Sequence, residues 1–180
     1  MNKFNLNKFL NKNKKNIKKI FPERKIISIY FDTLDLMLFN DSINKDYDKY
    51  KIRFRKYDDS NIISKEIKFS EKDGKYKIVT PTDYTNFKEI KNFYFKGNLL
   101  GPSLKVEYIR NYYEYKGNRL TIDSDVIFSK PSNRSNIYKL FDVYVFELKN
   151  LDKNQKNFFP TNPIFNAIKF SKYEEEIKKI

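Results

Sequence analysis

Charged and apolar side chains alternate in one short segment of the first third of the chain, residues 50–55. Lys51, Arg53 and Arg55 occupy every second position, and an aromatic residue or isoleucine fills each position between them. A β-strand repeats every two residues, so the three basic side chains share one face and the apolar side chains share the other. The pattern therefore predicts a strand with one strongly cationic side.

The same alternation recurs in two later segments. Residues 119–123 place Arg119, Thr121 and Asp123 on one face, and residues 146–149 place Glu147 and Lys149 on one face. For any single strand, the ordinary interpretation is a charged, solvent-facing side over a normal core. Several strands that all carry charge on one side favour a second interpretation, a sheet wrapped around a polyanion.

The remaining pattern predicts a single domain over residues 1–180 in the α+β class, mainly antiparallel β with a few helices packed outside. Further strands are expected at 26–32, 62–70, 75–79, 104–115 and 142–150, and helices at 5–20, 82–93 and 172–180. Residues 34–39 predict a helical turn or strand end, and 40–48 a loop. Tight turns are expected at 71–74 and 116–118, the latter with Gly117 at positive φ.

The charge balance points to an anionic partner. The chain has 37 basic and 23 acidic residues, a net charge of +14 and a pI of about 9.6, which suits nucleic acid, an acidic membrane, a nucleotide or polyphosphate. Lysine is abundant together with Asn and Ile, as an A/T-rich coding sequence would produce, so arginine is the better evidence. Four of the six arginines fall in predicted strands: Arg53, Arg55, Arg110 and Arg119.

The composition also excludes several kinds of chemistry. The sequence contains no Cys and no His, which excludes disulfides, thiolate chemistry, zinc fingers and a histidine general base. A bound metal is then a hard ion such as Mg²⁺ or Mn²⁺, held by carboxylates and phosphate oxygens.

Since no apolar run reaches the roughly 20 residues that cross a bilayer, we expect a cytoplasmic protein. Its aromatics lie mainly opposite the basic face, so no nucleic acid is expected.

A closed barrel would turn the charged faces inward, beneath apolar outer faces covered by helices. Its lumen would then contain Lys51, Arg53, Arg55, Lys68, Arg110, Arg119 and Lys149, with Glu66, Asp123 and Glu147. Buried charges are costly unless they are paired or solvated. A chain of phosphates would satisfy such a lumen, because its oxygens accept bidentate hydrogen bonds from guanidinium.

Several segments, taken in order, resemble the VTC (vacuolar transporter chaperone) domain. The family belongs to the polyphosphate polymerase branch of the triphosphate tunnel metalloenzymes, a CYTH-like superfamily. The resemblance lies in residues 21–33, 51–57, 65–68, 102–110, 119–123, 146–149 and 170–173. Each motif alone is loose, but their succession in this order is specific.

The resemblance implies a closed, eight-stranded tunnel that takes ATP and inorganic polyphosphate with Mn²⁺ or Mg²⁺. It would extend polyphosphate from the ATP γ-phosphate. Glu147 would hold the metal, with Lys75 or Lys77 as a further phosphate ligand. The other phosphate ligands implied are Lys3, Lys51, Arg53, Arg55, Lys68, Arg110, Arg119, Lys149 and Lys172.

One departure from the family pattern concerns its first strand, which carries a carboxylate two residues before a Lys-aromatic pair. Lys3 and Phe4 match the pair, but Met1 stands at the carboxylate position, which implies a truncated strand or a tunnel without that acidic ligand. Two alternatives stay open: a tunnel triphosphatase, and a non-catalytic polyphosphate binder. Coupling synthesis to translocation would need a separate membrane partner.

Overall fold

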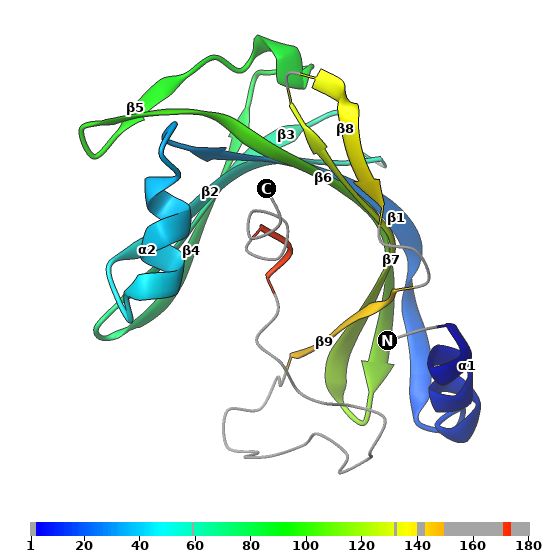
Figure 1. Ribbon diagram of the computed structural model, residues 1–180. Helices are drawn as coiled ribbons and strands as arrows, with labels where there is room; N and C mark the ends of the chain where they lie inside the picture. The colour runs from blue at the N-terminus through cyan, green and yellow to red at the C-terminus, as the bar shows by residue number, and fades with distance from the viewer. Residues whose placement is uncertain (1–2, 59, 132, 140–142, 150–170, 174–180) are drawn as a thin grey trace. The chain divides into compact units, whose positions relative to one another are not determined.

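The computed structural model describes residues 3–58, 60–131, 133–139, 143–149 and 171–173 (Figure 1). Its helices are α1 (Lys3–Lys12), α2 (Met37–Asn44) and the 3₁₀ turn η1 (Phe87–Glu89). Its strands are β1 (Ile17–Asp32), β2 (Lys49–Tyr57), β3 (Ile63–Glu71), β4 (Gly74–Thr82), β5 (Phe93–Phe95), β6 (Asn98–Tyr115), β7 (Asn118–Lys130), β8 (Asn133–Lys139) and β9 (Val145–Lys149).

The fold class is mainly antiparallel β, as the sequence predicted, and two α-helices accompany the strands among the described residues. The described strands join in the order β4-β3-β2-β1-β6-β7-β8, with β5 paired to β6 and β9 paired to β7. These nine strands exceed the eight expected for a tunnel, partly because residues 93–95 form the short extra strand β5. Closure of the strands into a barrel stays a prediction.

The chain forms two compact units that share strands β1, β6 and β7. Unit 1 contains the described parts of residues 1–25, 108–126 and 139–169. Unit 2 contains those of residues 26–107, 127–138 and 170–180. Among the described helices, none is both long and apolar enough to cross a membrane.

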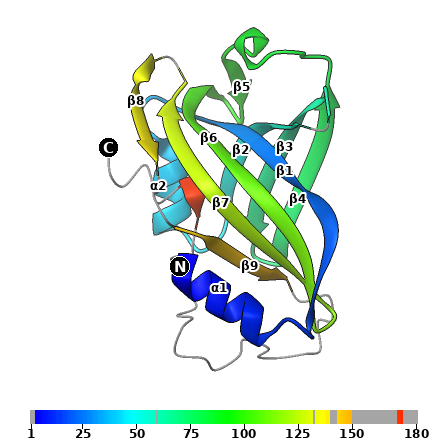
Figure 2. The same cartoon turned by 90° about the vertical axis from the view of Figure 1, so that its right-hand side faces the viewer.

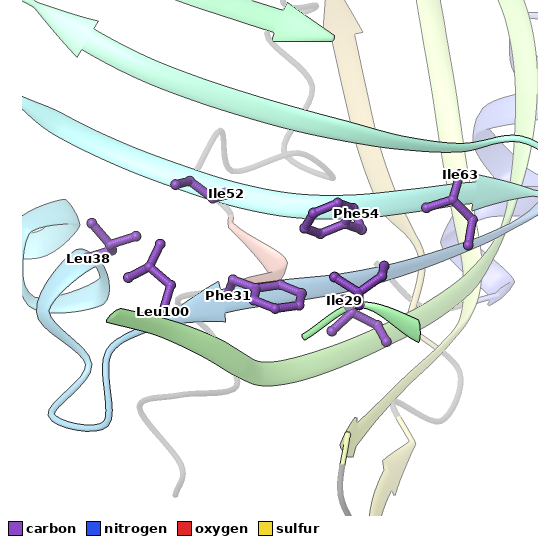
Figure 3. Close-up of a cluster of buried hydrophobic side chains, with 8 residues drawn as sticks. Ile29, Phe31, Leu38, Ile52, Phe54, Ile63 and Leu100 are labelled. Atoms are coloured by element: carbon purple, nitrogen blue, oxygen red, sulfur yellow. The ribbon is translucent and has the colours of Figure 1, made fainter. Parts of the chain in front are cut away.

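The core of unit 2 lies on the apolar face of strands β1 and β2. Ile29 and Phe31 of β1 pack with Ile52 and Phe54 of β2, beneath Leu38 of α2, with Ile63, Ile90 and Leu100 completing the cluster (Figure 3). The apolar positions of residues 50–55 therefore face the core, as predicted. Their burial leaves the alternate basic positions on the opposite face of the sheet.

Phe54 is expected to be the most sensitive apolar position of this core. Its side chain is 3% exposed, and its ring lies 5.1 Å from that of Phe31 and 5.9 Å from that of Phe93. Replacing Phe54 by alanine should lower the free energy of unfolding by about 3–5 kcal/mol. Urea denaturation checks this, with Phe54→Leu as the conservative control; equal stability of wild type and Phe54→Ala would contradict it.

The core of unit 1 forms beneath helix α1. Leu6 and Phe9 of α1 pack with Leu120 and Ile122 of β7, and Phe146 of β9 packs against this cluster. The ribbons of α1 and β9 lie next to each other in Figure 2, and the Phe9 and Phe146 rings are 5.8 Å apart. The ring of Phe9 also lies 5.7 Å from that of Tyr115. Tyr115 therefore contributes to packing in this core.

Two predicted helical segments differ from the structure, and a third lies mostly outside the described residues. The helix expected at 5–20 ends at Lys12, because Asn13 bonds back to the Phe9 carbonyl (2.9 Å) and a turn leads into β1 at Ile17. The helix expected at 82–93 is only the η1 turn, which follows β4 and is capped by Asn86. For the helix expected at 172–180, residues 174–180 lie outside the described part.

Helix α2 was predicted only in part, since residues 34–39 were expected to form a helical turn or strand end and residues 40–48 a loop. It begins after Leu36, which has φ of 57° and gives no side-chain cap. Instead, the carboxylate of Asp32 accepts hydrogen bonds from the backbone N–H groups of Leu38 (2.8 Å) and Phe39 (2.9 Å). This cap comes from the end of β1, beyond the range of ordinary capping patterns.

Both predicted hairpin turns are present. Strand β3 ends at Glu71 and β4 begins at Gly74, while β6 and β7 join through Lys116 and Gly117. Lys116 has φ of 50° and Gly117 has φ of 76°, as a two-residue turn with positive φ at both positions requires.

Candidate functional site

The strand register of unit 2 brings its basic side chains onto one face. Residues that pair directly across strands project to the same side of a sheet. Tyr30 pairs with Arg53, Arg53 with Glu66, Lys51 with Lys68, and Lys68 with Lys77. The charged face of unit 2 is hereafter the set Ser28, Tyr30, Lys51, Arg53, Arg55, Ser64, Glu66, Lys68, Lys75 and Lys77.

Glu66 lies at the centre of the charged face and contacts three basic side chains. Arg53 donates from Nε to its Oε2 at 2.7 Å, and Lys77 donates from Nζ to its Oε1 at 2.9 Å. Nη1 of Arg55 lies 3.8 Å from Oε2. The Glu66 side chain is 3% exposed, so one buried carboxylate orients a cluster that keeps an excess of positive charge.

The ionisation of Glu66 reflects this surrounding charge. Burial alone would raise its pKa, but the charges of Arg53 and Arg55, with hydrogen bonds from Lys77 and Arg53, lower the pKa to about 2. Glu66 is therefore ionised throughout the physiological range. A permanently charged carboxylate fixes the guanidinium of Arg53 before any ligand arrives.

Tyr30 holds the other side of the Arg53 guanidinium. Its hydroxyl accepts a hydrogen bond from Arg53 Nη1 at 2.9 Å. Burial opposes ionisation of the phenol, yet the charges of Arg53 and Arg55, the Arg53 hydrogen bond and the charge of Lys172 lower the pKa of Tyr30 to about 8. The phenol thus lies in a strongly positive environment.

Arg55 is more deeply placed than Arg53. Its side chain is 6% exposed, and its Nε donates to Ser28 Oγ at 3.0 Å. Both guanidiniums are consequently held by β1 side chains as well as by Glu66. Ser28 and Tyr30, which were not predicted, alternate with Ile27 and Ile29 in the sequence, so the same two-residue pattern is the signal that identifies them.

A row of three lysines crosses strands β2, β3 and β4 beside the arginines. Lys51, Lys68 and Lys77 stand in direct register, and like charges placed opposite each other destabilise a sheet. An anion over this row would offset the repulsion. Lys77 belongs to the Glu66 cluster, whereas Lys75 lies one step further along β4, opposite Ser70.

Residues 171–173 also contact the charged face, although they lie far away in the sequence. Lys51 donates from Nζ to Ser171 Oγ at 3.2 Å. The ring of Tyr173 stacks on that of Tyr30, with centroids 4.8 Å apart. Lys172, a predicted phosphate ligand, lies between these two contacts in the sequence, and its charge acts on Tyr30.

Unit 1 has its own charged cluster, on strands β6, β7 and β9. Arg110 donates to both oxygens of Asp123, from Nε at 2.6 Å and from Nη2 at 2.8 Å. Asp123 is 1% exposed. Burial alone would lower the pKa of Arg110, but the hydrogen bonds that Arg110 donates to the Asp123 carboxylate raise this pKa overall. Arg119 and Lys149 pair directly across β7 and β9, so two further predicted ligands share one face.

Glu147 suits a hard divalent ion that is held jointly by the protein and by phosphate oxygens. It does not suit a site in which protein side chains supply all the ligands. Its side chain is 62% exposed, with Oε2 at 3.7 Å from Nη2 of Arg110. Thr121 pairs with Glu147, and its buried hydroxyl has no hydrogen-bond partner among the described residues. The described part of the chain contains no group of three carboxylates that could hold a metal. Mg²⁺ commonly binds through one or two carboxylates plus substrate phosphates.

Lys3 is the predicted ligand that the structure places differently. It is the first residue of helix α1, whereas the family resemblance assigned it to a first strand. The buried carboxylates Glu66 and Asp123 were predicted to lie among the basic residues, but their part in orienting arginines was not. Cross-strand register, which alternation alone does not supply, decides those pairings.

The chain is thus a mainly antiparallel β protein in which buried carboxylates contact Arg53, Arg55 and Arg110. The crystal structure of a "putative adenylate cyclase" from Bacillus halodurans has a similar fold, with a TM-score of 0.53 and 14% identity, covering 84% of this chain and 77% of that one. The family model of the VTC domain matches residues 6–89 and 79–180. The chain therefore belongs to the VTC domain family. The comparison with curated proteins found no match.

Proposed function

We propose that this protein is a phosphotransferase that binds nucleoside triphosphate and extends inorganic polyphosphate from ATP. The observation that carries the proposal is the charged face of unit 2, where Arg53, Arg55 and Lys77 surround the single carboxylate of Glu66. Guanidiniums fixed in this way suit phosphate oxygens, since they offer paired donors at little further cost in conformational entropy. Membership of the VTC domain family supports the same ligand class.

The proposed reaction transfers the γ-phosphoryl group of ATP to a terminal oxygen of a polyphosphate chain. The new P–O bond forms at the chain end, the bond to the β,γ-bridging oxygen breaks, and ADP leaves. Phosphoryl transfer of this kind depends mainly on positioning and charge neutralisation. A phosphate oxygen is the nucleophile, so the reaction needs no histidine as a general base.

Glu147 would hold Mn²⁺ or Mg²⁺ in unit 1, with the Thr121 hydroxyl as a neighbouring oxygen. The ion would supply neutralisation of charge on the phosphate oxygens. Arg110, Arg119 and Lys149 belong to the same cluster and would bind phosphate there. A separate membrane protein, as the family resemblance implies, would be the partner for export of the product.

Incubation with ATP and Mn²⁺ should yield long polyphosphate, visible on a gel with a polyphosphate stain. Glu147→Gln should reduce the yield at least about tenfold by weakening metal binding, whereas Glu23→Gln, at an exposed acid of unit 1, should leave it unchanged. Release of free phosphate alone would indicate a tunnel triphosphatase instead. Binding of tripolyphosphate without turnover would indicate a non-catalytic binder.

A further inference from the structure

The segment 171–173 of unit 2 is held by contacts at both of its ends. At one end, Ser171 accepts the hydrogen bond from Lys51. At the other, Tyr173 is 2% exposed, stacks on Tyr30 at an interplanar angle of 15°, and meets the ring of Phe39 edge-on at 6.0 Å. Its hydroxyl donates to Oδ2 of Asp32. Lys172 lies between the two anchors in the sequence, and its charge acts on Tyr30 of the charged face.

Asp32 is a rigid anchor for the Tyr173 hydroxyl. Its Oδ1 accepts hydrogen bonds from the N–H groups of Thr33 and Leu38, both at 2.8 Å, and its Oδ2 accepts one from Phe39 at 2.9 Å. Through these bonds the carboxylate caps α2. Because it is 2% exposed, it is also shielded from an incoming ligand. A hydroxyl bonded to this group is fixed relative to both β1 and α2.

Tyr30 transmits the position of Tyr173 to Arg53. One face of the Tyr30 ring carries the Tyr173 ring, and its hydroxyl accepts from Arg53 Nη1. Moving Tyr173 would therefore release Lys172 directly and loosen Arg53 through Tyr30. The lowered pKa of Tyr30, to which Lys172 contributes, agrees with this arrangement.

We propose that Tyr173 is a positioning residue for phosphate binding, which it promotes by locking residues 171–173 to Asp32 and Tyr30 so that Lys172 and Arg53 are preorganised on one face. The proposal rests on the phosphate-binding part of the proposed function and is independent of whether polyphosphate is made. Preorganisation raises affinity by lowering the entropy cost of binding. Tyr173 itself acts through Lys172 and Arg53.

The test measures binding of tripolyphosphate by titration calorimetry, without ATP. Tyr173→Phe keeps the ring stack and removes the bond to Asp32, and we expect a loss of affinity of about tenfold, within the range of a hydrogen bond to a charged group. Tyr76→Phe is the matched control, because Tyr76 also donates to a carboxylate, that of Asp73 at 2.7 Å, but in the exposed β3–β4 hairpin. It should bind as wild type does.

A double-mutant cycle with Lys172→Gln separates positioning from general destabilisation. If Tyr173 acts partly through Lys172, Tyr173→Phe should cost clearly less in the Lys172→Gln background than in wild type. Equal costs in the two backgrounds, or wild-type affinity of Tyr173→Phe, would overturn the inference. If Tyr173→Phe fails to fold, Ser171→Ala decides in its place, with the same expected coupling to Lys172. If the wild-type protein does not bind tripolyphosphate, that result would contradict the proposed function instead.

Discussion

Replacing Glu66 by glutamine is expected to lower the free energy of unfolding by about 3–5 kcal/mol, the usual cost of breaking a buried ion pair from one side. Three basic groups then face one another across a buried site without their shared carboxylate. Tripolyphosphate should raise the unfolding midpoint of Glu66→Gln more than that of wild type, because the ligand replaces the lost negative charge. Thermal unfolding with and without ligand measures both effects.

The pH dependence of the wild type provides an independent check on Glu66. Its pKa of about 2 in the folded protein lies below the ordinary value of 4.5, so the unfolded chain binds a proton first as the pH falls. The stability that Glu66 contributes is thus complete above pH 4.5 and is lost as the pH falls towards 2.

Urea denaturation at decreasing pH should show a smaller loss of unfolding free energy in Glu66→Gln than in wild type. Glu71→Gln, at the exposed end of β3, is the control. Identical acid profiles for wild type and Glu66→Gln would contradict the pairing.

Replacing Arg53 by alanine is expected to have the largest effect on ligand binding. Truncating one member of a buried charge pair costs about 2–5 kcal/mol, which corresponds to a loss of affinity of roughly 30-fold to 4,000-fold. Arg53→Lys keeps the charge without the planar fork and should fall between alanine and wild type. Calorimetric titration with tripolyphosphate provides the measurement.

The matched control for Arg53 is Lys56→Ala, which removes a cation from the same strand on the opposite face. Lys56 pairs with Ile27 and Ile63, away from the charged face, so its removal should leave the affinity close to that of wild type. Circular dichroism must show that Arg53→Ala is folded at the temperature used, because Glu66 loses its shortest contact. Wild-type affinity of a folded Arg53→Ala would place the anion elsewhere.

Alternation along the chain was sufficient to predict which face of β2 is charged and which is buried. Lys51, Arg53 and Arg55 project opposite the core that contains Ile52 and Phe54, because a strand has only two sides and the apolar side is the one excluded from water. The turn at Gly117 was equally local, since positive φ is a property of that residue type. Such features need no knowledge of distant partners.

The features that the sequence did not reveal depend on partners outside the local segment. Glu66 meets Arg53 only through the β2–β3 register, and Tyr173 reaches Asp32 across 141 residues. Helix α2 contains Asn40, Asp41 and Ser42, three residues with low intrinsic helix propensity. Its cap comes from the preceding strand, so local propensity misjudged it. Contacts with the larger fold outweighed local preference in each case.

Tyr30 links occupancy of the charged face to proton exchange with the buffer. Its phenol ionises near pH 8 because Arg53, Arg55 and Lys172 favour the phenolate. An anion that neutralises those groups makes the phenolate less favourable, so binding above that pH draws a proton from solution. Apparent affinities recorded at pH 7 and at pH 9 therefore refer to different charge states of the receptor. In a chain without histidine, a tyrosine supplies that link.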